Sequence, residues 1–129
     1  IKKWFSSCFM FGAIKRYLWS IKSEKVASSI SALLFSNDRV LDFGCGNMLI
    51  AKFILQKLDV KITGIDVGDI NLTELPLTIY DGKRIPFKDK SFDVTYSIFV
   101  FHHIENIELL FTECLRVTKK RIIILSIKL

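Results

Sequence analysis

The stretch Val40-Leu41-Asp42-Phe43-Gly44-Cys45-Gly46-Asn47 starts as an apolar run and ends in a loop with two glycines. An apolar run that meets an acid and then a glycine is typical of a buried strand leading into a tight turn. Gly44 and Gly46 have no Cβ atom, so the turn can be sharp and a ligand can approach its backbone. Apolar side chains then recur at helical spacing from residue 47 to residue 58. The stretch therefore predicts a strand, a ligand-binding turn and a helix in succession.

Strand and helix patterns alternate on both sides of this unit. We expect strands at residues 39–43, 60–65, 77–80, 92–97 and 121–127. We expect helices at residues 23–35, 47–58 and 107–117, whereas the segment 67–76 is too short and too broken for more than one or two helical turns. Such alternation predicts an α/β fold, a Rossmann-like doubly wound parallel sheet with strand order 3-2-1-4-5. The unbroken apolar run Ile122–Leu125 predicts a last strand that is buried on both faces.

The length and composition indicate one globular domain. Half of the 129 residues are apolar and a quarter are charged, so we expect a single domain over 1–129, with a helical flank at 1–37 and the Rossmann-like core at 38–129. The net charge of +6 is concentrated in the flanks. Residues 1–40 hold seven basic side chains against two acids, residues 41–113 seven against eleven, and residues 114–129 five against none. A polyanion-binding domain usually has a basic stripe across its main surface, so we expect no nucleic acid partner.

The cysteines favour neither a metal site nor a disulfide. Cys8, Cys45 and Cys114 form no CxxC pair, and no histidine is spaced to complete a zinc site. An odd number of cysteines without a clear secretory signal is typical of a reducing compartment, so we expect a cytoplasmic protein that holds no metal.

The N-terminus has an apolar run, Trp4–Ile14, after two lysines. The run is too short to cross a bilayer as a helix, which takes about 20 residues. The residues close to one helical stripe are Trp4, Cys8, Phe11, Leu18 and Ile21. Such a stripe usually packs on its own domain, and this is what we expect here. Peripheral contact with a membrane surface through residues 4–21 is the alternative.

Polar residues follow the ends of four predicted strands. They are Asp42 with the glycine turn, Asp66-Val67, Asp81-Gly82 and Ser97. In a doubly wound sheet a ligand binds beyond the carboxyl ends of the strands, where the strand order reverses. We therefore expect these residues to meet around one ligand.

The chemistry of these residues points to an adenosine. Asp66 is placed to accept hydrogen bonds from a ribose diol. Asp81 can accept from an exocyclic amine such as adenine N6, while the Gly82 amide can donate to a ring nitrogen. A dinucleotide fits poorly, because its G-x-G-x-x-G fingerprint would need a glycine where Leu49 stands.

The ordered set of motifs resembles one family, the class I S-adenosylmethionine-dependent methyltransferases. The stretch 40–47 is similar to their first motif, and Ile62–Val67 to their second, whose acid binds the cofactor ribose. Tyr80–Gly82, Ile85–Phe87 and Ser91–Asp93 resemble their adenine-side loop and fourth strand. Phe101-His102-His103-Ile104 is similar to a segment of the small-molecule branch, and Glu113–Val117 to the helix before strand five.

This resemblance implies S-adenosylmethionine as cofactor and a small-molecule or lipid-like methyl acceptor. The residues that it marks for cofactor binding are Asp42, Gly44, Cys45, Gly46, Asp66, Val67, Asp81, Gly82 and Ser97. His103 is the candidate catalytic residue, as a general base for an acceptor that must lose a proton. The alternatives are a catalytically silent binding module with the same fold and, less favoured, a dinucleotide-dependent oxidoreductase.

Three features depart from the family pattern. Met48 stands where the first motif usually has a third glycine, and only a short segment separates Asp66 from Asp81. The Met48 side chain is expected either to crowd the methionine part of the cofactor or to turn into the packing of the following helix. The family continues past strand five with a helix and a β-hairpin, whereas this sequence stops at Leu129. We expect a C-terminally truncated form without that hairpin, with the edge of strand 121–127 available to a second copy or a partner.

Overall fold

The structure is a computed structural model that describes residues 8–101 and 104–126. Its elements, in chain order, are α2 (Cys8–Ser31), β1 (Arg39–Phe43), α3 (Leu49–Leu55), β2 (Lys61–Asp66), β3 (Leu77–Ile79), β4 (Phe92–Ile98), α4 (Ile107–Val117) and β5 (Thr118–Leu125). The segment between β2 and β3 contains no helix, as expected from its length.

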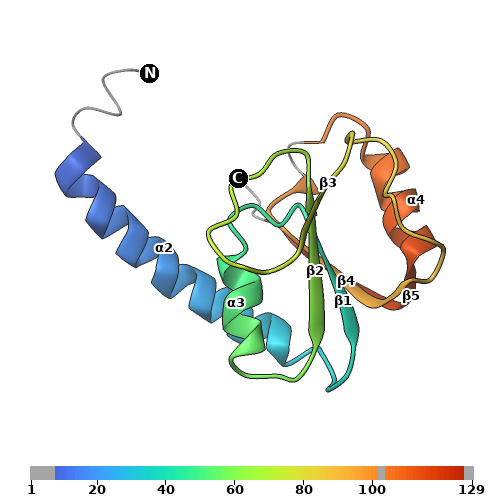
Figure 1. Ribbon diagram of the computed structural model, residues 1–129, viewed down its shortest axis with the longest axis horizontal. Coiled ribbons are helices and arrows are strands. Elements are labelled where there is room, and N and C mark those ends of the chain that lie inside the picture. The colour runs from blue at the N-terminus through green and yellow to red at the C-terminus, as the bar shows by residue number, and fades with distance from the viewer. Residues whose placement is uncertain (1–7, 102–103, 127–129) are drawn as a thin grey trace.

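The five strands form one parallel sheet in the order β3-β2-β1-β4-β5, which confirms the predicted topology. β1 lies between β2 and β4 (Figure 1). From β1 the chain proceeds to β2 and β3 on one side, and then crosses to β4 and β5 on the other. The strand order therefore reverses beside β1, and the carboxyl ends of β1, β2 and β4 meet at that point.

Helices cover both faces of the sheet. Alternate residues of a strand point to opposite faces, and the core divides accordingly. Val40, Ile62 and Val94 pack with α2 and α3 on one face. Leu41 and Ile65 pack on the other face with the buried residues of α4, which are Leu110, Cys114 and Val117. The site at the strand ends is thus supported from two packed layers.

The N-terminal helix differs from the predicted helix at 23–35 at both ends, since α2 starts at Cys8 and ends at Ser31. Its C-terminal part packs against α3, and its N-terminal part extends away from the sheet (Figure 1). The expected packing of the apolar stripe is wrong for two of its members, since Leu18 is 57% exposed and Ile21 is 37% exposed. Trp4 lies outside the described residues. Within the described part of the chain, no helix is both long and apolar enough to cross a membrane.

Two other elements differ from expectation. α3 starts at Leu49 and not at residue 47, because Met48 takes a left-handed backbone conformation that prevents the helix from starting earlier. β5 starts at Thr118, directly after α4, and pairs only with β4 among the described strands. The expectation that this strand is buried on both faces is wrong, since Ile124 is 43% exposed and Leu125 is 36% exposed.

Candidate cofactor site

A cavity of about 820 Å³ opens at the carboxyl ends of the strands. Eight of the nine residues predicted to bind a cofactor line it, namely Asp42, Gly44, Cys45, Gly46, Asp66, Val67, Asp81 and Gly82. They come from the ends of three strands that lie side by side in the sheet. The structure therefore brings together almost the whole predicted set.

The remaining predicted residues have other positions. Ser97 is buried inside β4 and does not line the cavity, and its Oγ has no hydrogen-bond partner among the described residues. β4 ends at Ile98, one residue later than predicted, so Ile98, Phe99 and Val100 line the cavity in its place. His103 lies outside the described residues.

The turn after β1 depends on its two glycines. Gly44 has a φ of +71°, and a Cβ atom there would collide with the side chain of Val100. Gly46 has a φ of +53°, and a Cβ atom there would have no neighbour within 4 Å. Both conformations favour glycine. Gly44 is thus required by close packing, whereas the space beside Gly46 is open to a ligand.

Asp66 ties this turn to β2. Its Oδ2 accepts a hydrogen bond from the Gly46 N–H at 2.9 Å, and its Oδ1 accepts one from the Val67 N–H at 2.7 Å. The amides of Gly44 and Cys45 donate to the Ile65 carbonyl, at 2.9 and 3.2 Å. A carboxylate oxygen has room for more than one donor, so Asp66 can hold the loop and still accept from a ligand.

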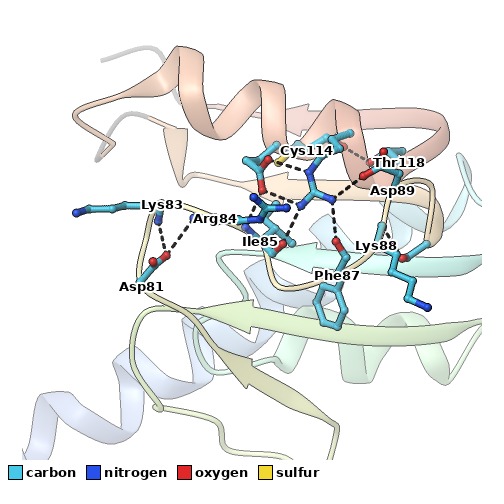
Figure 2. Close-up of polar contacts among 12 residues, drawn as sticks. Asp81, Lys83, Arg84, Ile85, Phe87, Lys88, Asp89, Cys114 and Thr118 are labelled. Carbon is cyan, nitrogen blue, oxygen red and sulfur yellow. Dashed lines mark hydrogen bonds and ion pairs between the residues drawn. The ribbon is translucent and has the colours of Figure 1, made fainter.

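Asp81 organises the loop after β3 in a similar way. Its Oδ1 accepts hydrogen bonds from the amides of Lys83 and Arg84, at 2.8 and 3.0 Å (Figure 2). These bonds, led by the one from Arg84, lower the pKa of the Asp81 carboxyl. The charged carboxylate therefore stands at the cavity edge with Oδ2 left for another donor.

The rest of that loop is clamped to α4 by an ion pair. Arg116 donates from Nε and Nη2 to the two carboxylate oxygens of Glu113, both at 2.8 Å. The same guanidinium donates to the carbonyls of Ile85 and Phe87 at 2.8 Å and to Asp89 at 2.9 Å (Figure 2). Glu113 also accepts from the Ile85 amide at 2.8 Å. The sequence motif contains Glu113 and Arg116, but their spacing alone does not reveal that they hold the loop bearing Asp81.

Asp42 is the buried acid of the site, being 3% exposed. It accepts a hydrogen bond from the Tyr96 hydroxyl at 2.8 Å. Burial raises the pKa of the Asp42 carboxyl to about 7, and the charge of Asp66 adds to this effect. Burial likewise raises the pKa of the Cys45 thiol well above its usual range, with Asp42 as a further cause. A thiolate nucleophile at Cys45 is therefore disfavoured.

Met48, at the third glycine position, turns away from the cavity. It keeps the left-handed backbone that glycine favours, with a φ of +63°, yet its side chain is fully buried in the core beneath α3. It packs over Gly64 of β2, where a Cβ atom would lie 2.6 Å from Met48 Cε. The second of the two expected orientations is the one observed.

The apolar side of the cavity was not predicted from the sequence. Trp19 of α2 lines it, together with Phe99, which has a φ of +58°. The Lys22 ammonium lies 5.8 Å from the Trp19 ring centroid and 5.4 Å from that of Phe99. α2 and the end of β4 thus share one wall. Across the described ranges 8–101 and 104–126, no group of three or more His, Cys, Asp or Glu side chains could hold a metal ion.

This parallel sheet, with its glycine turn and its acids at the strand ends, defines a nucleoside-binding domain of the class I methyltransferase type. Residues 41–125 match the methyltransferase domain family, and the chain belongs to this family. The family implies S-adenosylmethionine as the cofactor.

Individual relatives are similar over part of their length. The 27-O-demethylrifamycin SV methyltransferase of Amycolatopsis mediterranei (strain S699) is 30% identical over an alignment 83 residues long, and the match covers 54% of this chain and 30% of that protein. A structure from Methanococcus maripaludis, described as a candidate S-adenosylmethionine-dependent methyltransferase, has a TM-score of 0.70 and 20% identity over 83% of this chain and 55% of that one. The cyclase SpnF has a TM-score of 0.67 and 21% identity over 74% of this chain and 41% of that one. The chain thus spans about a third to a half of the length of these relatives, and the two structures show the fold alone.

Replacing Met48 by glycine should destabilise the protein. The loss of a fully buried side chain costs about 2–5 kcal/mol, while relief of the left-handed backbone returns about 1 kcal/mol. We expect the free energy of unfolding in urea to fall by about 1–4 kcal/mol. Met48→Leu, which nearly conserves volume, should cost less than about 1.5 kcal/mol. A glycine variant as stable as the wild type would contradict the packing of Met48.

Replacing Arg116 by lysine should loosen the loop that carries Asp81. An ammonium cannot reproduce the planar fork that meets Glu113 and two carbonyls, so we expect a loss of about 1–3 kcal/mol in the free energy of unfolding. Hydrogen exchange at the Ile85 amide should accelerate. Arg84→Lys is the matched control, because Arg84 enters this network through its backbone and its side chain is exposed. Equal exchange rates at Ile85 in both variants would exclude the clamp.

Proposed function

We propose that this chain binds S-adenosylmethionine at the strand-end cavity and serves methyl transfer to a small-molecule or lipid-like acceptor. The observation that carries the proposal is the arrangement of Asp66 and Asp81 after neighbouring strands, on the same cavity as the glycine turn. One carboxylate at the end of each of two neighbouring strands suits the two hydrogen-bonding ends of an adenosine, its ribose diol and its adenine amine.

The residues present fit each part of the cofactor. Asp66 would receive the ribose hydroxyls, and Asp81 the adenine amine through Oδ2. The open space beside Gly46 would take the part of the ligand that approaches the backbone. Asp42 would face the ammonium of the amino-acid end. Met48 does not obstruct this cavity, because its side chain lies in the core.

When bound, the cofactor would supply a methyl group on a positively charged sulfur. The chemistry supplied would be an in-line displacement at that methyl carbon, in which a bond to the acceptor would replace the carbon–sulfur bond and S-adenosylhomocysteine would be the leaving group. The chain's contribution is alignment of donor and acceptor, which supplies much of the rate in such displacements. The apolar residues Ile98, Val100 and Ile104 line the cavity and would help to exclude water. His103 stays our candidate for the base that removes the acceptor's proton, and its neighbour Ile104 lines the cavity.

The wall formed by Trp19 and Phe99 favours an acceptor with a substantial apolar part. The relative from Amycolatopsis mediterranei, by its name, acts on 27-O-demethylrifamycin SV, and an acceptor hydroxyl is in keeping with that similarity. The free thiols of Cys45 and Cys114 agree with a reducing cytoplasm. A silent binding module is the second candidate, because this fold does not by itself imply methyl transfer. The cyclase SpnF, for example, shares the fold under a name that denotes a different reaction.

Asp66→Asn should weaken cofactor binding. One acceptor oxygen is replaced by a donor that opposes both the loop amides and the ribose hydroxyls, so we expect a loss of about 1–3 kcal/mol, or about 5- to 150-fold in Kd. Isothermal titration with S-adenosylhomocysteine measures it. Asp69→Asn is the control, since Asp69 is exposed nearby and does not line the cavity. Equal weakening in both variants would leave a general charge effect as the explanation, and NADH binding without S-adenosylhomocysteine binding would exclude the proposed cofactor.

Methyl transfer itself separates the enzyme from the silent module. We expect the protein to move radiolabel from the methyl group of S-adenosylmethionine to at least one acceptor in a panel of hydroxylated aromatic and lipid-like compounds. Asp66→Asn should reduce that transfer in proportion to its loss of binding. Cofactor binding with no transfer to any compound, in a protein that carries the full length of the relatives, would favour the silent module.

A further inference from the structure

Asp42 and Tyr96 form a buried pair across two neighbouring strands. They are register partners in the parallel pairing of β1 with β4. Tyr96 is fully buried, and its hydroxyl donates to Asp42 Oδ2 at 2.8 Å. The same Asp42 lines the cavity. Asp42 thus faces the cavity, and Tyr96 holds the Asp42 carboxylate from within the core.

Burial of the ionised Asp42 carboxylate costs free energy unless a positive charge lies beside it. A buried carboxylate without a cation is unfavourable, and proteins usually respond by keeping the proton. Here burial raises the pKa of Asp42 to about 7, the Tyr96 hydrogen bond opposes the rise, and Asp66 adds to it. Among the residues that the structure describes, the titratable groups that act on Asp42 are Tyr96 on β4, Asp66 on β2 and the Cys45 thiol in the turn. None of these described groups is a cation.

A ligand with a cationic group would supply the missing charge. The amino-acid end of S-adenosylmethionine or S-adenosylhomocysteine carries an ammonium, and its approach favours the ionised carboxylate. Resting on the cofactor binding proposed above, we propose that Tyr96 is a positioning residue that holds Asp42 as the counter-ion of this ammonium, and that ligand binding releases a proton from Asp42. Tyr96 acts by donating to the ionised form, so that the carboxylate is stabilised when the ligand arrives.

The linkage predicts a definite pH dependence. The ligand prefers ionised Asp42, so its affinity falls as the pH decreases below about 7. For S-adenosylhomocysteine we expect the Kd to rise about fivefold from pH 7 to pH 6. Binding should release about half a proton at pH 7 and about nine-tenths of a proton at pH 6. Calorimetry in phosphate and in Tris, whose ionisation enthalpies differ, measures the released proton directly.

Two comparisons separate the proton released by Asp42 from protons released by any other group. Asp42→Asn removes the titrating carboxyl and keeps an oxygen for Tyr96, so the difference in proton release between it and the wild type belongs to Asp42. 5′-Methylthioadenosine has the adenine and ribose but no ammonium. Its binding should release no proton from Asp42.

Tyr96→Phe tests the positioning role. Without the hydroxyl the ionised carboxylate loses its donor, so the midpoint of the pH profile should move up by about one pH unit. Thr95→Val is the matched control. It also removes one buried hydroxyl from β4, where Thr95 is paired at 2.7 Å with Thr118, and it lies on the opposite face of the sheet. We expect a comparable loss of stability there without any movement of the pH profile.

The outcomes are distinct. Proton release with S-adenosylhomocysteine that is lost in Asp42→Asn supports the inference, and the shifted profile of Tyr96→Phe assigns the positioning role. If S-adenosylhomocysteine binds with the same pH profile as 5′-methylthioadenosine, the inference is overturned while the proposed function stands. If Tyr96→Phe fails to fold, the wild-type and Asp42→Asn measurements still decide the proton linkage. If neither ligand binds, the proposed function and the inference both fail.

Discussion

The turn after β1 holds the site together, since its backbone serves two purposes at once. Gly44 passes so close to Val100 that no side chain could stand there, and its amide, with that of Cys45, donates to the Ile65 carbonyl of β2. Gly46 then donates to Asp66. Two neighbouring strand ends are thereby fixed to each other through backbone amides. The carboxylate that is best placed for a ribose is oriented by the same turn that leaves room for the ligand.

The loop that carries Asp81 is held by α4, which packs on the face of the sheet away from α2 and α3. The loop that carries Asp81 has little secondary structure of its own, and Arg116 compensates by bonding to the carbonyls of Ile85 and Phe87. Hydrogen bonds from Arg116 also hold the pKa of Glu113 below its usual range, so the pair remains charged. Such bidentate pairing fixes geometry as well as supplying energy. α4 therefore contributes to the adenosine side of the site although its own buried face packs under the sheet.

The sequence predicts those features that depend on local pattern. The structure brings Asp66 and Asp81 to one cavity, as the pattern of parallel strands led us to expect, because Asp66 ends β2 and Asp81 lies just beyond the end of β3. Tyr96 could not be predicted, since its partner Asp42 is set by the register between strands that lie far apart in sequence. Ser97 was misplaced by a one-residue error in a strand end, which exchanges a side chain in the cavity for one in the core. Trp19 was missed because only the tertiary packing of α2 brings it to the strand ends.

The charge of the cavity explains why this glycine turn suits a sulfonium nucleoside better than a dinucleotide. Among its described lining residues are four acids, Asp42, Asp66, Asp81 and Glu105, and one cation, Lys83. An anionic pyrophosphate would need free amides at the start of the following helix. Here the Leu49 amide already donates to Asn47 Oδ1, and the left-handed backbone at Met48 shortens the helix by two residues relative to its sequence pattern. A cationic ligand finds the reverse situation, because each carboxylate that repels a phosphate attracts an ammonium or a sulfonium. The departure from the glycine pattern at Met48 therefore leaves the polar cavity intact and strengthens the core beneath it, and the acids around the turn decide which nucleoside can enter.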